Sequence, residues 1–139
     1  PSIYYGSEWG IEGRKEGGND DPLRPALNLA EMEEKYKDCQ LTEHIRMLGR
    51  LKKELSPLSE GKYRELLLTN RQYAFARIQD DKAVIVAVNN DENPAHVSIP
   101  VPAGGNAVNA VTGEPVNVEN GRINAELSPA GSLIVSVNI

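Results

Sequence analysis

The stretch that decides the fold is residues 71–90, which read RQYAFARIQDDKAVIVAVNN. Two short apolar runs, at residues 73–78 and 83–88, flank the acidic pair Asp80-Asp81. Both runs are rich in aromatic or β-branched residues, and both are shorter than an ordinary helix. The pattern therefore predicts a β-hairpin whose turn lies at the acidic pair.

The second run is apolar on both of the faces that a strand would present. Side chains along a strand point alternately to opposite sides of a sheet. Val84, Val86 and Val88 would share one face, and Ile85 and Ala87 would occupy the other. A strand of this kind is covered on both sides. We therefore expect the hairpin in the middle of a packed sheet, with the rest of the chain supplying two covers.

The composition of the 139-residue chain argues against several classes of function. Apolar residues make up 40% of it, which is enough for one core of ordinary size. The net charge of −5 and the lack of a basic stripe argue against nucleic-acid binding. The single cysteine, Cys39, cannot form an internal disulfide, and no apolar run is long enough to span a membrane.

The first ten residues, PSIYYGSEWG, contain the strand formers Ile3, Tyr4 and Tyr5, and Gly6 ends the run. They lack the basic start and long apolar centre of a signal peptide, which favours a cytoplasmic protein. The chain does not begin with methionine and opens directly on this strand-like run. We therefore expect it to be a piece of a larger protein.

Between this run and the hairpin, the pattern changes from loop to helix. Residues 11–24 form a polar, glycine-rich loop of the kind that often carries function. Pro25 and the apolar spacing after it predict a short helix at residues 26–36. A firmer helix is predicted at residues 41–55, because apolar residues recur there at steps of three or four. This apolar stripe consists of Leu41, Ile45, Leu48, Leu51 and Leu55.

From residue 62 onward, short strand-like segments are separated by turn signals. The predicted strands are residues 63–69, 73–79, 83–89, 95–101, 107–111, 115–118, 122–127 and 132–139. Asn120-Gly121 is the strongest short hairpin signal in the chain, and Ala103-Gly104-Gly105 is a further expected turn. This succession predicts a small antiparallel sandwich.

Several of these segments resemble the α-amylase family, glycoside hydrolase family 13. PSIYYGSEWG is similar to the family's eighth barrel strand, often G-x-P-x-I-Y-Y-G-x-E-x-G. GGNDDPLRP is similar to the G-x-D-P-x-x-R segment of the neopullulanase, cyclomaltodextrinase and oligo-1,6-glucosidase branch. SEGKYRELLLTNRQYAFARIQDDKAVIVAVNN resembles the start of the family's C-terminal β domain, and TGEPVNVENGRINAELSPAGSLIVSV resembles its end. The likeness covers the whole chain.

The resemblance implies a (β/α)₈ barrel followed by an antiparallel Greek-key β-sandwich, of which this chain holds the end. Residues 1–60 are then the last strand, substrate loop and last helix of the barrel, and residues 61–139 are the C-terminal sandwich. The family hydrolyses α-glucosidic bonds in starch-derived or maltodextrin-type glucans through a retaining mechanism that uses paired carboxylates. Those carboxylates lie on other barrel strands. We therefore expect no catalytic residue in this chain, which by itself is inactive and stabilises the parent enzyme.

The family also implies that the loop after the eighth strand lines the sugar groove. Asp21 and Arg24 match the Asp and Arg of the motif, and their implied role is hydrogen bonding to sugar hydroxyls. Only Pro22 and Leu23 lie between them, where family members often have three residues. The implied partner is an α-glucan oligosaccharide. In isolation, the surface that faces the barrel is expected to drive dimerisation or to be covered by residues 1–36.

Three groups of residues among the first 24 positions have more than one interpretation. Glu8 either points into the groove or holds the loop by accepting backbone hydrogen bonds. Trp9 either stacks on a sugar ring or packs beneath the loop. Asn19, Asp20 and Asp21 do not have the spacing of a calcium loop, so we expect no cofactor in this chain. The resemblance leaves calcium open for the longer enzyme.

A stand-alone carbohydrate-binding module is the alternative function, because a sandwich of this size can bind glycans through an aromatic platform. The strands offer only Tyr63, Tyr73 and Phe75, all in apolar runs that we expect to be buried. Aromatic residues make up only 5% of the chain, which ranks this function below the first. A purely structural interaction domain is the third interpretation.

Overall fold

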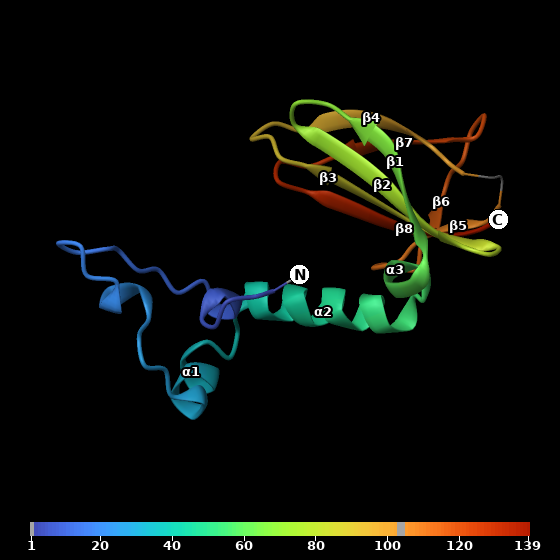
Figure 1. Cartoon of the computed structure of the whole chain (residues 1–139). Coiled ribbons are helices and arrows are strands. Elements are labelled where there is room, and N and C mark those ends of the chain that lie inside the picture. The colour runs from blue at the N-terminus through green and yellow to red at the C-terminus, as the bar shows by residue number, and fades with distance from the viewer. Residues whose placement is uncertain (1, 103–104) are drawn as a thin grey trace. The chain divides into compact units, whose positions relative to one another are not determined.

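The computed structural model describes residues 2–102 and 105–139, so the predicted turn at Ala103-Gly104-Gly105 lies largely outside the described residues. The chain forms two compact units, Pro1–Arg50 and Leu51–Ile139. The second unit contains all the named strands (Figure 1). No helix in the described parts of the chain is long and apolar enough to cross a membrane.

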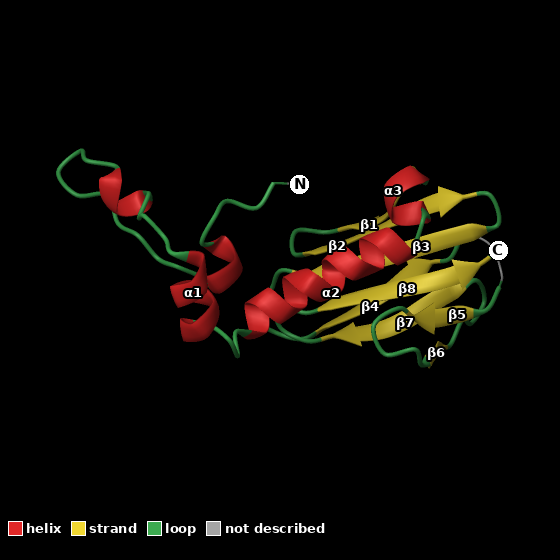
Figure 2. Ribbon diagram, turned by 90° about the horizontal axis from the view of Figure 1, so that it is seen from below, coloured by secondary structure: helices red, strands yellow, loops and turns green. Residues whose placement is uncertain are grey.

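The second unit is an antiparallel sandwich, as the sequence predicts. Its larger sheet has the strand order β1-β2-β3-β8-β5-β6, and β4 pairs with β7 in a smaller sheet (Figure 2). The pairs β3–β8 and β4–β7 are nested in the sequence, so the chain crosses between the sheets as in Greek-key sandwiches. The strands are β1 (Lys62–Leu68), β2 (Gln72–Gln79), β3 (Lys82–Asn89), β4 (Ala95–Pro100), β5 (Ala107–Asn109), β6 (Pro115–Val116), β7 (Arg122–Leu127) and β8 (Ser132–Asn138).

The β2–β3 hairpin lies inside the larger sheet, and this prediction is confirmed. Gln79 pairs with Lys82 across the two-residue turn, and β3 lies between β2 and β8. Asp80 adopts a φ of 52°, a left-handed conformation that aspartate tolerates better than most residues. The acidic pair therefore forms the tight turn that its position between two apolar runs indicates.

The core lies between the two sheets and uses one face of the hairpin. Ile85 of β3 pairs with Val135 of β8, and both are fully buried. They belong to one cluster with Ile99 of β4 and Ile123 of β7, which come from the smaller sheet. The smaller sheet is therefore the first of the two covers that the apolar pattern requires.

The other face of the larger sheet is covered only in part. The short helix α3 (Pro57–Glu60) packs on β2 and β3. Val84 is fully buried, Val86 is half-buried, and Val88 is 37% exposed. The prediction of complete cover on both faces is therefore wrong at the Val88 end, because α3 is too short to extend along the whole strand.

Three aromatic side chains share this partly covered face. The ring of Phe75 lies 5.9 Å from that of Tyr63 and 5.8 Å from that of Tyr73. Tyr63 is 53% exposed, and the other two are half-buried. The expectation that all three are buried is wrong, because strand alternation places Tyr63 on the open face of an edge strand.

We expect the tyrosine titration of the chain to contain a step near pH 12. A hydrogen bond between the hydroxyls of Tyr63 and Tyr73, with desolvation, raises the pKa of Tyr63 to about 12. The folded state thus favours the neutral phenol, so this stabilisation is present below pH 10 and is lost as pH rises toward 12. Ultraviolet absorbance of tyrosinate measures the step. Tyr73→Phe should move it to lower pH, and an unchanged curve in that variant would contradict the assignment.

The edges of the larger sheet are irregular or short. In β1, the pairing with β2 shifts register between Glu65 and Leu67. The same strand carries the charged side chains Lys62 and Arg64. At the opposite edge, β6 consists only of Pro115–Val116. Neither edge is therefore a long, flat strand.

Among the described residues, the α-helices of the first unit are α1 and most of α2. α1 (Leu29–Lys35) begins later than predicted, because the Asn28 side chain accepts hydrogen bonds from the N–H groups of Ala30 and Glu31 and caps it. α2 (Gln40–Glu54) confirms the predicted helix at residues 41–55 within one residue and continues into the second unit, where Leu51 is buried.

Residues Ile3–Tyr5 form no strand, contrary to the expectation from their composition. Ile3 is 57% exposed, and Tyr4 and Tyr5 are also largely exposed. A barrel strand is held by backbone hydrogen bonds to neighbouring strands. No strand of the described residues pairs with this segment, so its β-propensity alone does not fix an extended conformation.

Candidate functional site

The polar loop of the first unit is ordered by a tight glycine turn. Gly17 and Gly18 both adopt positive φ, at 55° and 85°. This conformation lets Glu16 and Asn19 form a pair of backbone hydrogen bonds. The turn brings residues 15 and 20 close together.

Asp21 and Arg24 lie at the two ends of one 3₁₀ turn, η2 (Asp21–Leu23). The Asn19 side chain accepts a hydrogen bond of 2.9 Å from the Asp21 N–H, and Arg24 N–H donates to the Asp21 carbonyl at 2.9 Å. Residues three apart in a 3₁₀ turn lie on the same side of it. The structure therefore places Asp21 and Arg24 side by side along the backbone, and both are exposed.

Asp20, which was not predicted to be a sugar contact, forms the ion pairs of this loop. Its carboxylate lies 2.9 Å from Lys15 Nζ and 4.0 Å from Arg24 Nη2. No helix or strand periodicity links Lys15 to Asp20, so only the glycine turn between them could have indicated the contact. Within the described residues, the Asp21 carboxylate has no ion pair of its own.

Two tyrosines of the first segment support the turn. The hydroxyl of Tyr5 donates to the carbonyl of Pro25 at 3.3 Å, and its ring lies 4.8 Å from that of Tyr4. Desolvation and the neighbouring Tyr4 raise the pKa of Tyr5. A hollow of about 80 Å³ lies among Tyr4, Tyr5 and Leu23. The Asp21–Leu23 turn therefore rests on the strand-like motif that precedes it.

This arrangement can bind hydroxyl groups, and it shows no pair of acid and nucleophile. Asp21 offers carboxylate acceptors, and Arg24 offers several fixed donors. Adjacent hydroxyls of a sugar provide the complementary donors and acceptors. Across residues 2–102 and 105–139, no group of three or more His, Cys, Asp or Glu side chains could hold a metal ion.

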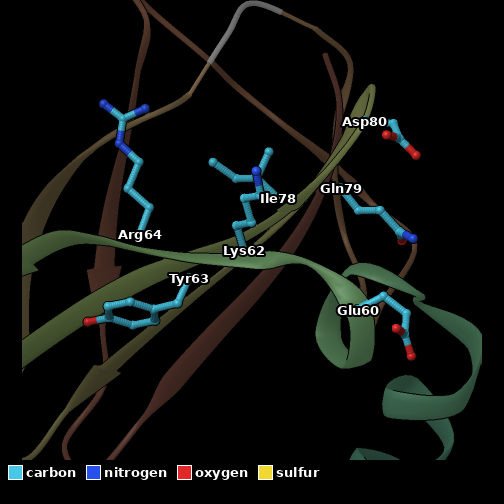
Figure 3. A pocket seen from close by; sticks show the side chains of 7 residues that line it. All are labelled: Glu60, Lys62, Tyr63, Arg64, Ile78, Gln79 and Asp80. Atoms are coloured by element: carbon cyan, nitrogen blue, oxygen red, sulfur yellow. The ribbon is translucent and has the colours of Figure 1, made fainter.

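A surface hollow of about 600 Å³ lies at edge strand β1 and does not form a convergent site. Figure 3 shows Lys62 and Arg64 on one side of β1 and Tyr63 on the other. This divergence follows from strand alternation. The residues that line this hollow therefore do not converge on one ligand. The hollow is a weaker candidate for a binding site than the Asp21–Arg24 turn.

The sandwich matches a known domain family. Residues 63–136 match the family described as "Neopullulanase-like, C-terminal domain". The chain belongs to the neopullulanase-like branch of the α-amylase family. A curated neopullulanase, Neopullulanase 2 of Thermoactinomyces vulgaris, is 32% identical over 97% of this chain. That match covers 23% of the relative, so this neopullulanase-like chain spans about a quarter of the relative's length.

Solved structures agree with this neopullulanase-like fold. A cyclomaltodextrinase superposes with a TM-score of 0.80 at 23% identity, covering 98% of this chain and 23% of that one. The α-amylase of Geobacillus thermoleovorans, complexed with acarbose, superposes with a TM-score of 0.78 at 19% identity. It covers 98% of this chain and 29% of that one. At these identities the superpositions support the fold alone.

Glu8 and Trp9 make contacts within the first unit of this neopullulanase-like chain. The backbone carbonyl of Glu8, not its side chain, holds the segment, because it accepts a hydrogen bond of 2.6 Å from Thr42 Oγ1. The Cys39 thiol also lies 3.9 Å from this carbonyl. Trp9 stacks on Tyr36, with ring centroids 6.2 Å apart and an interplanar angle of 21°. The contact partners of both residues thus come from the region around the two helices.

Proposed function

We propose that the chain is the C-terminal part of an enzyme that hydrolyses α-glucosidic bonds in starch-derived or maltodextrin-type glucans. The family match over residues 63–136 is the observation that carries this proposal. Its support extends toward the N-terminus, since the likeness to Neopullulanase 2 covers 97% of the chain. The α-amylase relative that was solved with acarbose agrees with an oligosaccharide as the ligand.

In this proposal the reaction is a retaining hydrolysis, in which one carboxylate attacks the sugar and a carboxylic acid protonates the leaving oxygen. These groups come from parts of the enzyme that this chain does not include. The chain contributes a stabilising sandwich and one turn of the substrate groove. On that turn, Asp21 accepts hydrogen bonds from sugar hydroxyls, and Arg24 donates to them.

Replacing Asp21 or Arg24 by alanine in the longer enzyme is expected to lower kcat/KM on maltodextrins by about tenfold to a hundredfold. A lost hydrogen bond to a charged group costs roughly 1.5–3 kcal/mol, which corresponds to this range. Since neither residue is proposed to enter the chemical step, most of the loss should appear in KM. Initial rates at varied maltodextrin concentration measure both constants.

The matched control for Arg24→Ala is Arg14→Ala, in the same loop and also exposed. It should leave kcat/KM within about twofold of the parent value, since surface changes of this kind are nearly neutral. Equal losses in both variants would show a general charge effect and contradict a specific contact. A longer enzyme without activity on maltodextrins would overturn the proposed function.

Two further proposals have a specific observation behind them. A stand-alone glycan-binding module remains the alternative function, supported by the exposed ring of Tyr63 beside Phe75. Detection of a native protein of this chain's own size would favour it. Dimerisation of the isolated chain is supported by Leu41 and Leu48 of α2, which are 43% and 39% exposed. Sedimentation at a monomer mass would exclude the dimer.

A further inference from the structure

We propose that Asn120, in the hairpin turn before β7, is a site of spontaneous deamidation in the folded chain. Asn120-Gly121 is the one place in the sequence where glycine follows asparagine. The modification replaces the neutral side-chain amide with a carboxylate and needs no enzyme. It involves neither the Asp21–Arg24 turn nor sugar, so it stands or falls independently of the proposed function.

The reaction has two steps, and water is the co-reactant. The Gly121 nitrogen forms a bond to the Asn120 Cγ atom while the Cγ–Nδ2 bond breaks. The amide nitrogen leaves as ammonia with the proton that the Gly121 nitrogen loses, and a five-membered succinimide ring remains. Water then opens this ring at either of its two carbonyl groups, which gives aspartate or isoaspartate. Because the attacking nitrogen must lose its proton, the rate rises with pH.

The first argument is the accessibility of the attacking nitrogen. Both turn residues are exposed, and a Cβ atom at Gly121 would meet nothing within 4 Å. Glycine has no side chain to shield its nitrogen, and its backbone rotates easily. Across the described residues, neither the Asn120 carbonyl nor the Gly121 N–H makes a backbone hydrogen bond. The peptide unit that must rotate for the attack is therefore not held in place by such a bond.

The second argument is the freedom of the Asn120 side chain. Other asparagines of the sandwich are held by their amides: Asn89 donates to two backbone carbonyls, and Asn117 donates to the Glu119 carboxylate. Such a side chain loses hydrogen bonds when it rotates toward the next nitrogen. The exposed Asn120 side chain has no hydrogen-bond partner in the described part of the chain. It can therefore rotate into the attack geometry without this loss.

The two products should affect the turn differently. Asn120 and Gly121 adopt φ values of 52° and 71°, and aspartate is well tolerated at the first position of such a two-residue hairpin turn. Isoaspartate adds one carbon atom to the main chain, which disrupts the pair of 2.9 Å hydrogen bonds between Glu119 and Arg122. β7 begins at Arg122, and the next residue, Ile123, is fully buried. The isoaspartate form should therefore be the less stable of the two.

Incubation of the folded 139-residue chain in mildly alkaline buffer, followed by mass spectrometry of its peptides, measures conversion at each asparagine. Asn120 should convert faster than Asn90, which is also exposed but precedes Asp91. The matched control is Asn120→Gly, which removes the amide and keeps a residue suited to positive φ. This variant should show no conversion at the turn and should unfold at nearly the same urea concentration as the fresh parent chain.

The same incubation in urea shows what the unfolded chain does. Conversion of Asn120 in the unfolded chain alone would show that the turn protects the amide, and it would overturn the proposal. Conversion in the folded chain no faster than that of Asn90 would also overturn it. Labelling with an isoaspartate methyltransferase separates the two products. An isoaspartate form with the urea midpoint of the fresh chain would contradict the expected effect on β7.

Discussion

Replacing Asn89 by alanine is expected to lower the free energy of unfolding of the sandwich by about 3 kcal/mol. The Asn89 side chain is 2% exposed, at the end of β3. The side-chain oxygen Oδ1 accepts a hydrogen bond of 2.9 Å from Gln72 Nε2. The side-chain nitrogen Nδ2 donates to the backbone carbonyls of Asn93 and Ser128 at 2.9 and 3.0 Å. Alanine removes all three hydrogen bonds at a buried position, and only the Ser128 carbonyl keeps another donor, the N–H of Gly131.

Two further variants test whether these hydrogen bonds cause the loss. Asn90→Ala changes the next, exposed residue, and it should alter the free energy of unfolding by no more than about 0.5 kcal/mol. Asn89→Asp keeps the shape but directs a carboxylate at two carbonyls, so it should destabilise at least as much as alanine. Urea denaturation followed by circular dichroism gives all three values. A milder effect of Asn89→Asp would contradict the donor role of the amide.

Replacing Gly61 by alanine is expected to destabilise the chain by about 3 kcal/mol. A Cβ atom at this position would lie 2.5 Å from the carbonyl oxygen of Pro57 and 2.9 Å from the backbone nitrogen of Ile78. Both atoms are backbone, so the clash can be relieved only by moving α3 away from β2. The φ and ψ of Gly61, −67° and 153°, suit alanine well. The expected loss is therefore purely steric.

Gly49→Ala provides the matched control, because a Cβ atom there meets nothing within 4 Å. Gly49 lies inside α2, where alanine has the higher helix propensity, so this variant should be more stable by about 1 kcal/mol. Opposite signs for the same substitution at two positions would be hard to attribute to anything but local packing. Thermal unfolding of both variants measures this difference, and a neutral Gly61→Ala would show that α3 moves freely.

The sandwich could be predicted because its signals are local. The short apolar runs at residues 73–78 and 83–88, with the acidic pair between them, specify a hairpin without knowledge of any distant contact. Asn120-Gly121 behaves in the same way, since both residues adopt the positive φ values of a tight hairpin turn. The observed strand boundaries accordingly lie within two residues of the predicted ones.

The first unit could be predicted less well, because its conformation depends on contacts that sequence spacing does not reveal. Ile3–Tyr5 has strong β-propensity but no neighbouring strand to pair with. The start of α1 is set by Asn28, a capping signal that the earlier Pro25 obscured. The exposure of Tyr63 depends on which face of β1 is left uncovered by other elements. The residue pattern of an edge strand does not predict which face that is.

The candidate site shows the same division. The motif identifies Asp21 and Arg24, and the 3₁₀ turn explains how only two intervening residues still leave them adjacent. The ion pairs of Asp20 required the folded geometry, since they depend on residues brought close by a turn. The role of Asp21 and Arg24 in sugar binding stays a prediction until the kinetic measurement above is made.

The irregular edges of the larger sheet have a consequence for how copies of this chain behave when crowded. The hairpin at residues 72–89 contains an apolar, β-branched segment of the kind that stacks into fibrils when an open strand edge recruits another chain. At one edge of the sheet, the register shift and the charged side chains of β1 disrupt the pairing surface that another strand would need. At the other edge, β6 is short and contains a proline, which has the same effect. We therefore expect this sheet to resist the addition of strands from other chains. While the sandwich is folded, its apolar central strands should not start amyloid formation.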